Sequence, residues 1–224
     1  FNNFNEAQKF VKKSGTPIVV KADGLAAGKG VTICNSKIEA FKSIKEILNG
    51  KFKSSKKVVL EEFLEGEELS YFLLVDQSFS HFFGTAQDHK KVGERDLGKN
   101  TGGMGAYSPA PILSNKLEEK IKNKIINPTL KAMKELNHPY RGFLYAGLMI
   151  KKNEPYLIEY NIRMGDPECQ ALMMRLKSDF VEIIKKATQN KVNELKIEWS
   201  KKNSITIVLC SKGYPGNYNK GKII

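Results

Sequence analysis

The residues best suited to chemistry form one short run, Glu159–Arg163, with the sequence EYNIR. If this run is a strand, Glu159, Asn161 and Arg163 share one face, because side chains alternate along a strand. The other face would pack through Ile158, Tyr160 and Ile162. Carboxylate and amide oxygens suit Mg²⁺, which also takes phosphate oxygens and water, and an arginine can bind a phosphoryl group. The run predicts a metal–phosphate site, although a surface strand with outward polar residues would show the same pattern.

A glycine-rich loop between two apolar runs is the second candidate. It contains Gly24, Gly28 and Gly30, with Lys21 before it and Lys29 within it. Backbone N–H groups of such a loop can approach phosphate oxygens closely, because no Cβ is in the way. The loop therefore predicts a phosphate site, and a plain hairpin loop stays open as an alternative.

Two more segments could bind a ligand. The run Glu61–Glu68 ends a strand in an acidic turn, whose backbone could bond a base edge while Glu68 bonds ribose hydroxyls; an acidic hairpin would explain the same residues. Asp88–Pro111 has no helix or strand periodicity, and a loop of this length in a compact domain is usually functional or disordered. Ser, Cys and His form no triad-like pattern, which favours a reaction activated by ATP and a metal.

The elements that must position these residues alternate irregularly, which favours an α/β or α+β fold with a mainly antiparallel sheet. Asn5 is the expected cap of the first helix, and Ser36 with Glu39 predicts a capping box for the second. We expect helices at 6–13, 36–50, 114–136 (with a kink or a division into two helices at Pro128), 167–175 and 179–189. We expect strands at 17–21, 31–34, 58–64, 68–76, 78–87, 142–152, 155–162 and 204–211.

Composition limits the class of protein. The 224 residues carry a formal net charge of +13, but only four of the 37 basic residues are arginines, the residue preferred for bidentate phosphate and base contacts. This favours a lysine-rich surface over a nucleic-acid interface. The three cysteines have no Cys-x-x-Cys spacing, which excludes a zinc ribbon and argues against a disulfide scaffold. No apolar run reaches membrane-spanning length. The cysteine usage and the absence of a signal-peptide pattern favour a reducing compartment, so we expect a cytoplasmic protein.

Taken together, these runs resemble the phosphoribosylamine–glycine ligase (glycinamide ribonucleotide synthetase) family of the ATP-grasp superfamily. The matching stretches are PIVVKADGLAAGKGV at 17–31, EEFLEGEE at 61–68, DHK at 88–90, NTGGMGAYSP at 100–109, GFLYAGLM at 142–149 and EYNIRMGDPE at 159–168. The resemblance implies an α+β fold of the ATP-grasp type, with two α+β subdomains gripping ATP between antiparallel sheets. It divides the chain into a core at 1–203, with a smaller lid at about 14–78, and the start of a truncated C-terminal domain at 204–224.

The resemblance also implies roles for single residues. Arg163 and Lys29 would act on the transferred phosphate, and Glu159 and Asn161 would bind Mg²⁺ or Mn²⁺. ATP would contact Lys21, Gly24, Gly28, Lys29, Gly30, Glu62, Phe63, Leu64 and Glu68. The substrate side would contain Asp88, Lys90, Asn100, Gly102 and Gly103. The run at 94–99 stands where the family commonly has a more Asp/Gly-rich run, which changes the charge of the loop, so substrate contacts there are open.

The implied reaction joins 5-phosphoribosylamine to glycine through glycyl phosphate, with ATP as co-substrate, in de novo purine synthesis. The partners would be these small molecules, not nucleic acid or a membrane, and the protein would be a monomer. The family's N-terminal domain, which helps to bind phosphoribosylamine, has no counterpart here, so we expect the chain alone to be inactive. Another ATP-grasp carboxylate–amine ligase and a basic binding module are the alternatives.

Overall fold

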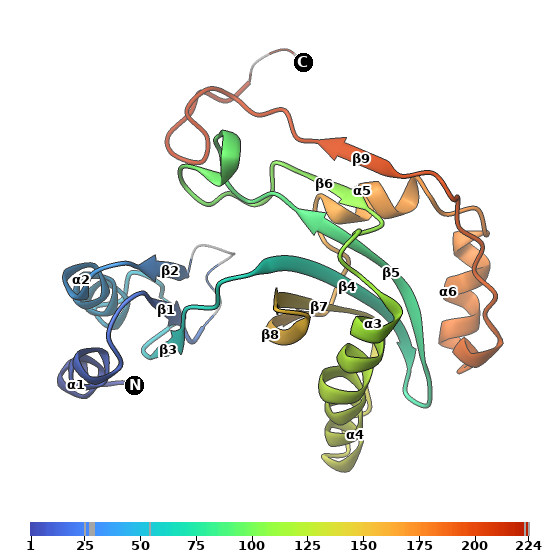
Figure 1. Ribbon diagram of the computed structural model, residues 1–224, viewed down its shortest axis with the longest axis horizontal. Coiled ribbons are helices and arrows are strands. Elements are labelled where there is room, and N and C mark those ends of the chain that lie inside the picture. Colours follow the sequence, from blue (N-terminus) through green and yellow to red (C-terminus); the bar gives the residue numbers. More distant parts are fainter. Residues whose placement is uncertain (25, 27–29, 54, 222, 224) are drawn as a thin grey trace. The chain divides into compact units, whose positions relative to one another are not determined.

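The protein is described by a computed structural model that covers residues 1–24, 26, 30–53, 55–221 and 223. The chain folds into two compact units, unit 1 (Phe1–Glu65) and unit 2 (Gly66–Ile224) (Figure 1). In the part of the chain that the structure describes, no helix is both long and apolar enough to cross a membrane.

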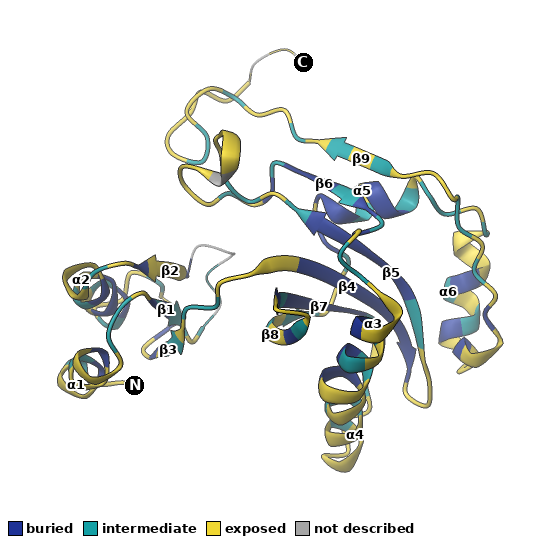
Figure 2. Ribbon diagram, viewed as in Figure 1, coloured by how far each residue is buried: buried dark blue, intermediate teal, exposed yellow. Residues whose placement is uncertain are grey.

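Unit 1 is a small antiparallel sheet covered by two helices. Its described elements are α1 (Phe4–Ser14), β1 (Ile18–Ala22), β2 (Val31–Cys34), α2 (Lys37–Leu48) and β3 (Val58–Glu62). The described strands lie in the order β2-β1-β3. Apolar side chains of both helices and of the sheet form one core, which includes Val11, Val20 and Ile44 (Figure 2).

Local sequence explains where the helices of unit 1 begin. The predicted capping box is present on α2, where the Ser36 side chain and the Glu39 side chain each bond the other's backbone. The cap of α1 is Asn3, whose side chain accepts from the N–H groups of Asn5 and Glu6, so the prediction of Asn5 was wrong. The helix starts earlier because Asn3, not Asn5, takes the extended conformation that a cap needs.

Unit 2 is built on a larger sheet. Its described strands are β4 (Glu67–Asp76), β5 (Ser80–Asp88), β6 (Gly105–Ser108), β7 (Arg141–Lys151), β8 (Glu154–Asn161) and β9 (Ser204–Ile207), in the order β8-β7-β4-β5-β6-β9. Every pairing in it is antiparallel.

The helices of unit 2 cover both faces of that sheet. They are α3 (Asn115–Ile121), α4 (Asn127–Glu135), α5 (Glu168–Met173) and α6 (Phe180–Thr188), with shorter helical turns at Glu94–Asp96, Lys122–Ile126 and Val192–Glu194. One face packs on α3 and the segment after it through residues such as Leu117 and Ile125. The other packs on α5 and α6 through Leu172 and Ile183.

The predicted 114–136 helix is divided, as expected, into two helical segments. They are joined by a π-helical turn over Lys122–Ile126. Pro128 lies in the first turn of α4, where its missing N–H costs little. The division therefore lies just before the proline.

Two expectations about organisation differ from the structure. The boundary between the two units lies after Glu65, because β4 pairs with β7 from Glu67 onward and α1 packs into the core of unit 1; the predicted lid at about 14–78 has other bounds. The segment at 204–207, where the resemblance predicts the start of a further domain, is β9, which pairs with β6 in the sheet of unit 2.

The loop expected at 88–111 contains structure that periodicity did not indicate. Strand β6, with the sequence GAYS, pairs with both β5 and β9. A run of four small or polar residues shows no apolar alternation, so its strand conformation depends on neighbours that are distant in sequence.

Candidate functional site

Strand register gathers the predicted metal ligands and several other polar residues on one face of the unit 2 sheet. Residues directly opposite each other on neighbouring strands point to the same side. Glu159 lies opposite Gly147, and Asn161 lies opposite Tyr145. Gly147 in turn lies opposite Ser70 on β4. Glu159 and Asn161 therefore share the face that carries Ser70 and Tyr145.

The same register brings in residues from β4 and β5. Ser70 lies opposite Ala86, and side chains two positions apart on a strand share a face. Glu68 and Asp88 are two positions from Ser70 and Ala86 respectively, so they also lie on this face. We call the set Glu68, Asp88, Glu159 and Asn161 the site face.

The Glu159–Asn161 pair offers oxygen ligands to a cation. The Asn161 side-chain N–H donates to Glu159 Oε1 at 3.2 Å, and Glu159 is exposed. A Cβ at Gly147 would approach the Glu159 Cγ to 3.4 Å, so the glycine leaves room beside the carboxylate. Within the described ranges no group of three or more His, Cys, Asp or Glu side chains could hold a metal. Two protein oxygen ligands leave positions for phosphate and water, which suits Mg²⁺.

The apolar side of the same run is only partly as predicted. Tyr160 packs against the core on the opposite face, and its hydroxyl lies 2.8 Å from Thr129 Oγ1. Ile162 is 77% exposed, so its expected packing was wrong. The strand ends at Asn161, and alternation no longer fixes the residues after it. Arg163, also past the strand end, is exposed and donates from Nη1 to its neighbour's carbonyl, Met164 O, at 2.8 Å.

An ion pair joins Glu68, a predicted ATP ligand, to Lys90, a predicted substrate ligand. Lys90 Nζ donates to Glu68 Oε2 at 2.7 Å. Burial would lower the pKa of this lysine, but the carboxylates of Glu68, Asp88 and Glu159 outweigh it, so the pKa lies above its usual value. The predicted ribose ligand and the predicted substrate lysine therefore lie side by side, and Lys90 carries its positive charge toward the site face.

Asp88 has the most perturbed carboxyl group of the site face. Its Oδ1 is buried, and no described group donates a hydrogen bond to it. Burial raises the pKa of Asp88 to about 7; Glu168 and Glu68 add to the rise, and Lys90 opposes it. A buried carboxyl oxygen without a hydrogen-bond donor lowers the stability of the fold unless a ligand or a proton binds to it.

The backbone of Gly103 lies against that carboxyl group. Gly103 has a φ of +119°, and a Cβ there would lie 2.9 Å from Asp88 Oδ1 and collide with Pro167. Glycine is required both by the backbone conformation and by the close approach. The predicted substrate residues Asp88 and Gly103 are thus in contact in the structure. Asn100, by contrast, is exposed and forms an isolated antiparallel β-bridge with Lys91.

Glu168 belongs to this region, and sequence reasoning gave it no role. It is only 2% exposed and begins α5. Its Oε1 accepts from Ser70 Oγ at 3.0 Å, and Ser70 Oγ lies 2.9 Å from the Tyr145 hydroxyl. Glu168 ends the stretch EYNIRMGDPE that carries the family resemblance, and nothing in that stretch indicates these two partners.

The glycine-rich loop of unit 1 is described in part. Ala22 N–H donates to Gly30 O at 2.8 Å, which closes the hairpin. A Cβ on Gly30 would lie 2.6 Å from the Ala26 Cβ, so the loop needs glycine at that position, and Gly24 lies in a bend. The predicted phosphate residues Gly28 and Lys29 lie outside the described residues.

Lys21 has a protein partner in the structure. Its Nζ lies 2.6 Å from Glu61 Oε2, and its side chain is 15% exposed. The predicted adenine residues follow this partner in sequence: Glu62 is exposed at the end of β3, and Phe63 and Leu64 come directly after it with intermediate exposure.

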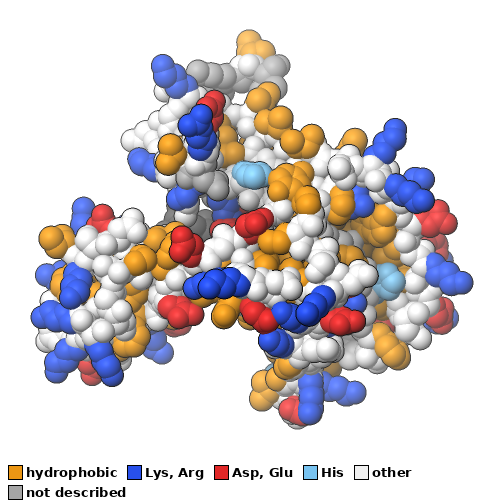
Figure 3. Space-filling view, viewed as in Figure 1, with side chains coloured by type: hydrophobic (Ala, Val, Ile, Leu, Met, Phe, Trp, Pro, Cys, Tyr) orange, Lys and Arg blue, Asp and Glu red, His pale blue; other side chains and the backbone are white. Residues whose placement is uncertain are grey.

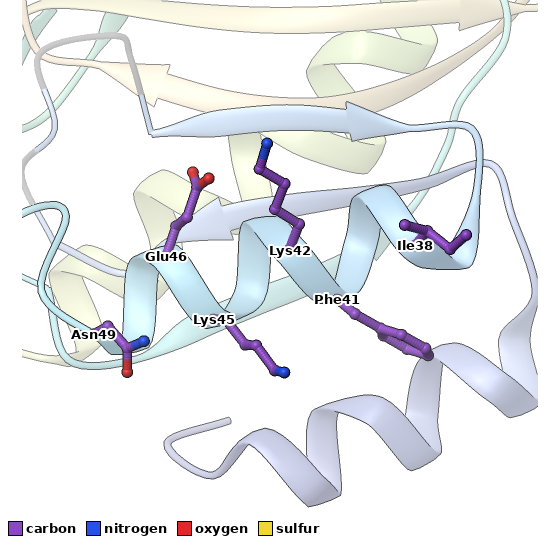
Figure 4. A pocket seen from close by; sticks show the side chains of 6 residues that line it. All are labelled: Ile38, Phe41, Lys42, Lys45, Glu46 and Asn49. Atoms are coloured by element: carbon purple, nitrogen blue, oxygen red, sulfur yellow. The ribbon is translucent and has the colours of Figure 1, made fainter.

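Other surfaces of the described residues give no comparable constellation. A shallow pocket along α2 is lined by Ile38, Phe41, Lys42, Lys45, Glu46 and Asn49 (Figure 4). It contains none of the predicted site residues. On the face shown in Figure 3, Lys and Arg side chains are spread over the surface among Asp and Glu, not gathered into one stripe.

Comparison with known proteins identifies the family. Residues 1–169 match the model of the phosphoribosylglycinamide synthetase ATP-grasp (A) domain. The chain is 50% identical to phosphoribosylamine–glycine ligase of Vigna unguiculata over 221 residues, which cover 97% of the chain and 71% of that protein. It is 49% identical over its whole length to the chloroplastic phosphoribosylamine–glycine ligase of Arabidopsis thaliana, of which it covers 43%.

A solved structure agrees. The crystal structure of phosphoribosylamine–glycine ligase from Thermotoga maritima superposes with a TM-score of 0.85 at 34% identity, over 98% of this chain and 56% of that one. The chain spans about half the length of most of the curated relatives it matches. The predicted α+β fold of the ATP-grasp type is confirmed, and the chain belongs to the phosphoribosylglycinamide synthetase family, whose ATP-grasp domain it contains.

Proposed function

We propose that this chain is the ATP-binding core of a ligase that joins 5-phosphoribosylamine to glycine. The observation that supports this most is the site face, on which a carboxylate–amide pair, a buried carboxyl group and a lysine paired with Glu68 come together from separate strands. Phosphoryl transfer followed by acyl transfer needs positioning and charge, not a protein nucleophile.

ATP contacts are proposed from both units, each taken by itself. In unit 1, the backbone of the loop with Gly24, Gly28 and Gly30 would bind phosphate oxygens together with Lys21 and Lys29, and Glu62–Leu64 would meet the adenine. In unit 2, Glu68 would bond the ribose hydroxyls. To bind phosphate, the Lys21 Nζ would either leave the Glu61 carboxylate or contact both that carboxylate and the phosphate.

The donor set of Glu159 and Asn161 fits Mg²⁺, and Mn²⁺ would accept the same oxygen ligands. A cation bound there would neutralise charge on the transferring phosphate. Arg163 lies two residues beyond Asn161, past the end of β8, and its guanidinium would bind the same phosphate once it turns from the Met164 carbonyl.

The reaction would proceed in two balanced steps. The glycine carboxylate oxygen attacks the γ-phosphorus, the bond to the β-phosphate oxygen breaks, and ADP leaves. The sugar amine then attacks the acyl carbon of glycyl phosphate, loses a proton, and releases inorganic phosphate. Glycine and phosphoribosylamine would lie near Asp88, Lys90, Asn100, Gly102 and Gly103.

The remaining assignments belong to the same proposal. Small molecules would be the partners, without nucleic acid or a membrane; the protein would be a monomer, and it would work in the cytoplasm. A different carboxylate–amine ligase of the same fold is the second candidate, and the extent of similarity to phosphoribosylamine–glycine ligases speaks against it.

The test is ADP release with glycine and freshly made phosphoribosylamine, measured for this chain and for the full-length Thermotoga relative. We expect the 224-residue chain to bind ATP and to turn over far more slowly than the relative. Holding both reactants in near-attack geometry lowers the activation free energy by about 7–11 kcal/mol in favourable cases, and the 224 residues span 56% of that relative. Comparable turnover by the chain would place the whole substrate site within it, and no ATP binding would refute the proposed function.

A further inference from the structure

The loop Asn100–Gly105, which we call the substrate loop, is held on one side by the segment that leaves β5. Thr101 N–H donates to Lys90 O at 2.7 Å, and Met104 N–H donates to His89 O at 2.8 Å. Within the loop, Gly103 N–H donates to Thr101 Oγ1 at 3.0 Å. These bonds hold Thr101 and Met104, and none of them joins Gly102 or Gly103 to a residue outside the loop.

The C-terminal segment supplies support from the other side. Pairing of β9 with β6 ends at Ile207 opposite Gly105. It continues one step further, because Val208 N–H donates to Met104 O at 2.9 Å. A turn then brings Tyr214 back to the loop, and Gly102 N–H donates to the Tyr214 hydroxyl oxygen at 3.0 Å.

The turn that presents Tyr214 is itself well supported. Gly213 has a φ of +107°, and a Cβ there would lie 2.5 Å from Asn217 O, so the turn requires glycine. Tyr214 N–H donates to Ser211 O, and Gly216 N–H donates to Gly213 O. The Tyr214 ring also packs edge-on against Tyr218, with 5.9 Å between centroids.

The hydrogen bond to Tyr214 holds a part of the substrate loop that has no side chains by which it could be held. Gly102 and Gly103 have no side chains, so only their backbone groups can be held, and glycine has the largest backbone freedom to lose. Gly103 is the residue that lies against Asp88 Oδ1. A bond that fixes Gly102 therefore also restricts the approach of the next residue to the buried carboxyl group.

We propose that Tyr214 is a positioning residue for the substrate loop: its hydroxyl fixes Gly102 so that Gly103 stays against Asp88 in the geometry that binds substrate. This rests on the proposed function, in which the loop binds glycine. It gives the segment after β9 a part in the site, although that segment contains none of the residues that the family resemblance picked out.

The test uses Tyr214→Phe, which removes only the hydroxyl, with Tyr218→Phe as the matched control in the same segment. The glycine Kd is measured by calorimetry with a non-hydrolysable ATP analogue and Mg²⁺, and the analogue's own Kd is measured alone. Hydrogen exchange of the peptide that covers Asn100–Gly105 is followed by mass spectrometry in both variants.

We expect Tyr214→Phe to raise the glycine Kd about two- to tenfold, the effect of losing one hydrogen bond, and to speed exchange of the substrate loop. The analogue's Kd should stay unchanged, and Tyr218→Phe should behave as wild type. An unchanged glycine Kd, or equal weakening of glycine and the analogue, would overturn the proposal. If wild type binds the analogue but no glycine, the proposed substrate is wrong and the positioning role in glycine binding falls with it. Wild-type exchange in Tyr214→Phe would show that the bond does not hold the loop.

Discussion

Replacing Gly103 by alanine should be among the most damaging single-methyl changes in unit 2. The backbone there has a φ of +119°, and the added Cβ would meet Asp88 Oδ1 at 2.9 Å and collide with Pro167. Strain of this kind costs about 1–3 kcal/mol, and forcing atoms into a packed site costs about 1–3 kcal/mol more. We expect Gly103→Ala to lower the free energy of unfolding by about 2–6 kcal/mol.

Gly142→Ala separates the two contributions. Gly142 has nearly the same φ, +124°, but the nearest atom to an added Cβ is the Tyr140 hydroxyl at 3.8 Å, an ordinary contact. This variant should show only the backbone cost, about 1–3 kcal/mol. The difference between the two variants then measures how tightly Gly103 lies against Asp88 and Pro167.

Trp199 makes the assay specific to unit 2. It is the only tryptophan in the sequence, and its ring packs edge-on against Phe83 with 5.2 Å between centroids. Urea unfolding followed by its fluorescence gives the free energy of unfolding for wild type and both variants. Equal losses for the two variants would refute the close approach of Gly103 to Asp88.

Two further predictions concern charge. Because the pKa of Asp88 is raised to about 7 from about 3.9 in an unfolded chain, the folded state keeps a proton that the unfolded state releases, and stability contributed by this group falls as pH rises from about 4 to 7. Asp88→Asn removes this titration, so Trp199-monitored unfolding should show the variant gaining about 1–3 kcal/mol on wild type between pH 5 and pH 8, allowing for partial exposure; a constant difference would contradict the raised pKa. Lys21→Ala should raise the Kd of ATP more than that of adenosine. Glu61→Gln, which removes the negative charge of one partner of that lysine, should leave the Kd of ATP unchanged or lower it in calorimetry; equal losses for both ligands in Lys21→Ala would make the lysine structural.

The sequence was most informative where a function depends on near neighbours in the chain. Glu159 and Asn161 share a face because they are two positions apart on a strand, and the structure shows that face directly. The capping box at Ser36 and Glu39 is local in the same way. The alternation of side chains along a strand does not predict the exposure of Ile162, because the strand ends one residue earlier.

Residues that depend on distant partners were not predictable from the sequence. Glu168 meets Ser70, which lies 98 positions away, and Tyr214 meets Gly102 across 112 positions. The sequence predicts a loop where β6 lies, because these four residues show no apolar alternation. The segment is a strand because β5 and β9 pair with it. Periodicity and spacing describe one segment at a time, and these contacts exist only once the sheet has formed.

The most direct test of the account is Mg²⁺-dependent binding of ATP by this chain and by Glu159→Gln. The variant removes one anionic oxygen from the site face and keeps the shape of the side chain. Glu119→Gln, an exposed position on α3, makes the same change in charge away from it. Calorimetry should show the Kd of ATP with Mg²⁺ rising about tenfold or more in Glu159→Gln, with little change in the Kd of ATP without the metal and none in Glu119→Gln. Equal Mg²⁺-dependent affinity in all three proteins would contradict the assignment of Glu159 and Asn161 as the metal ligands.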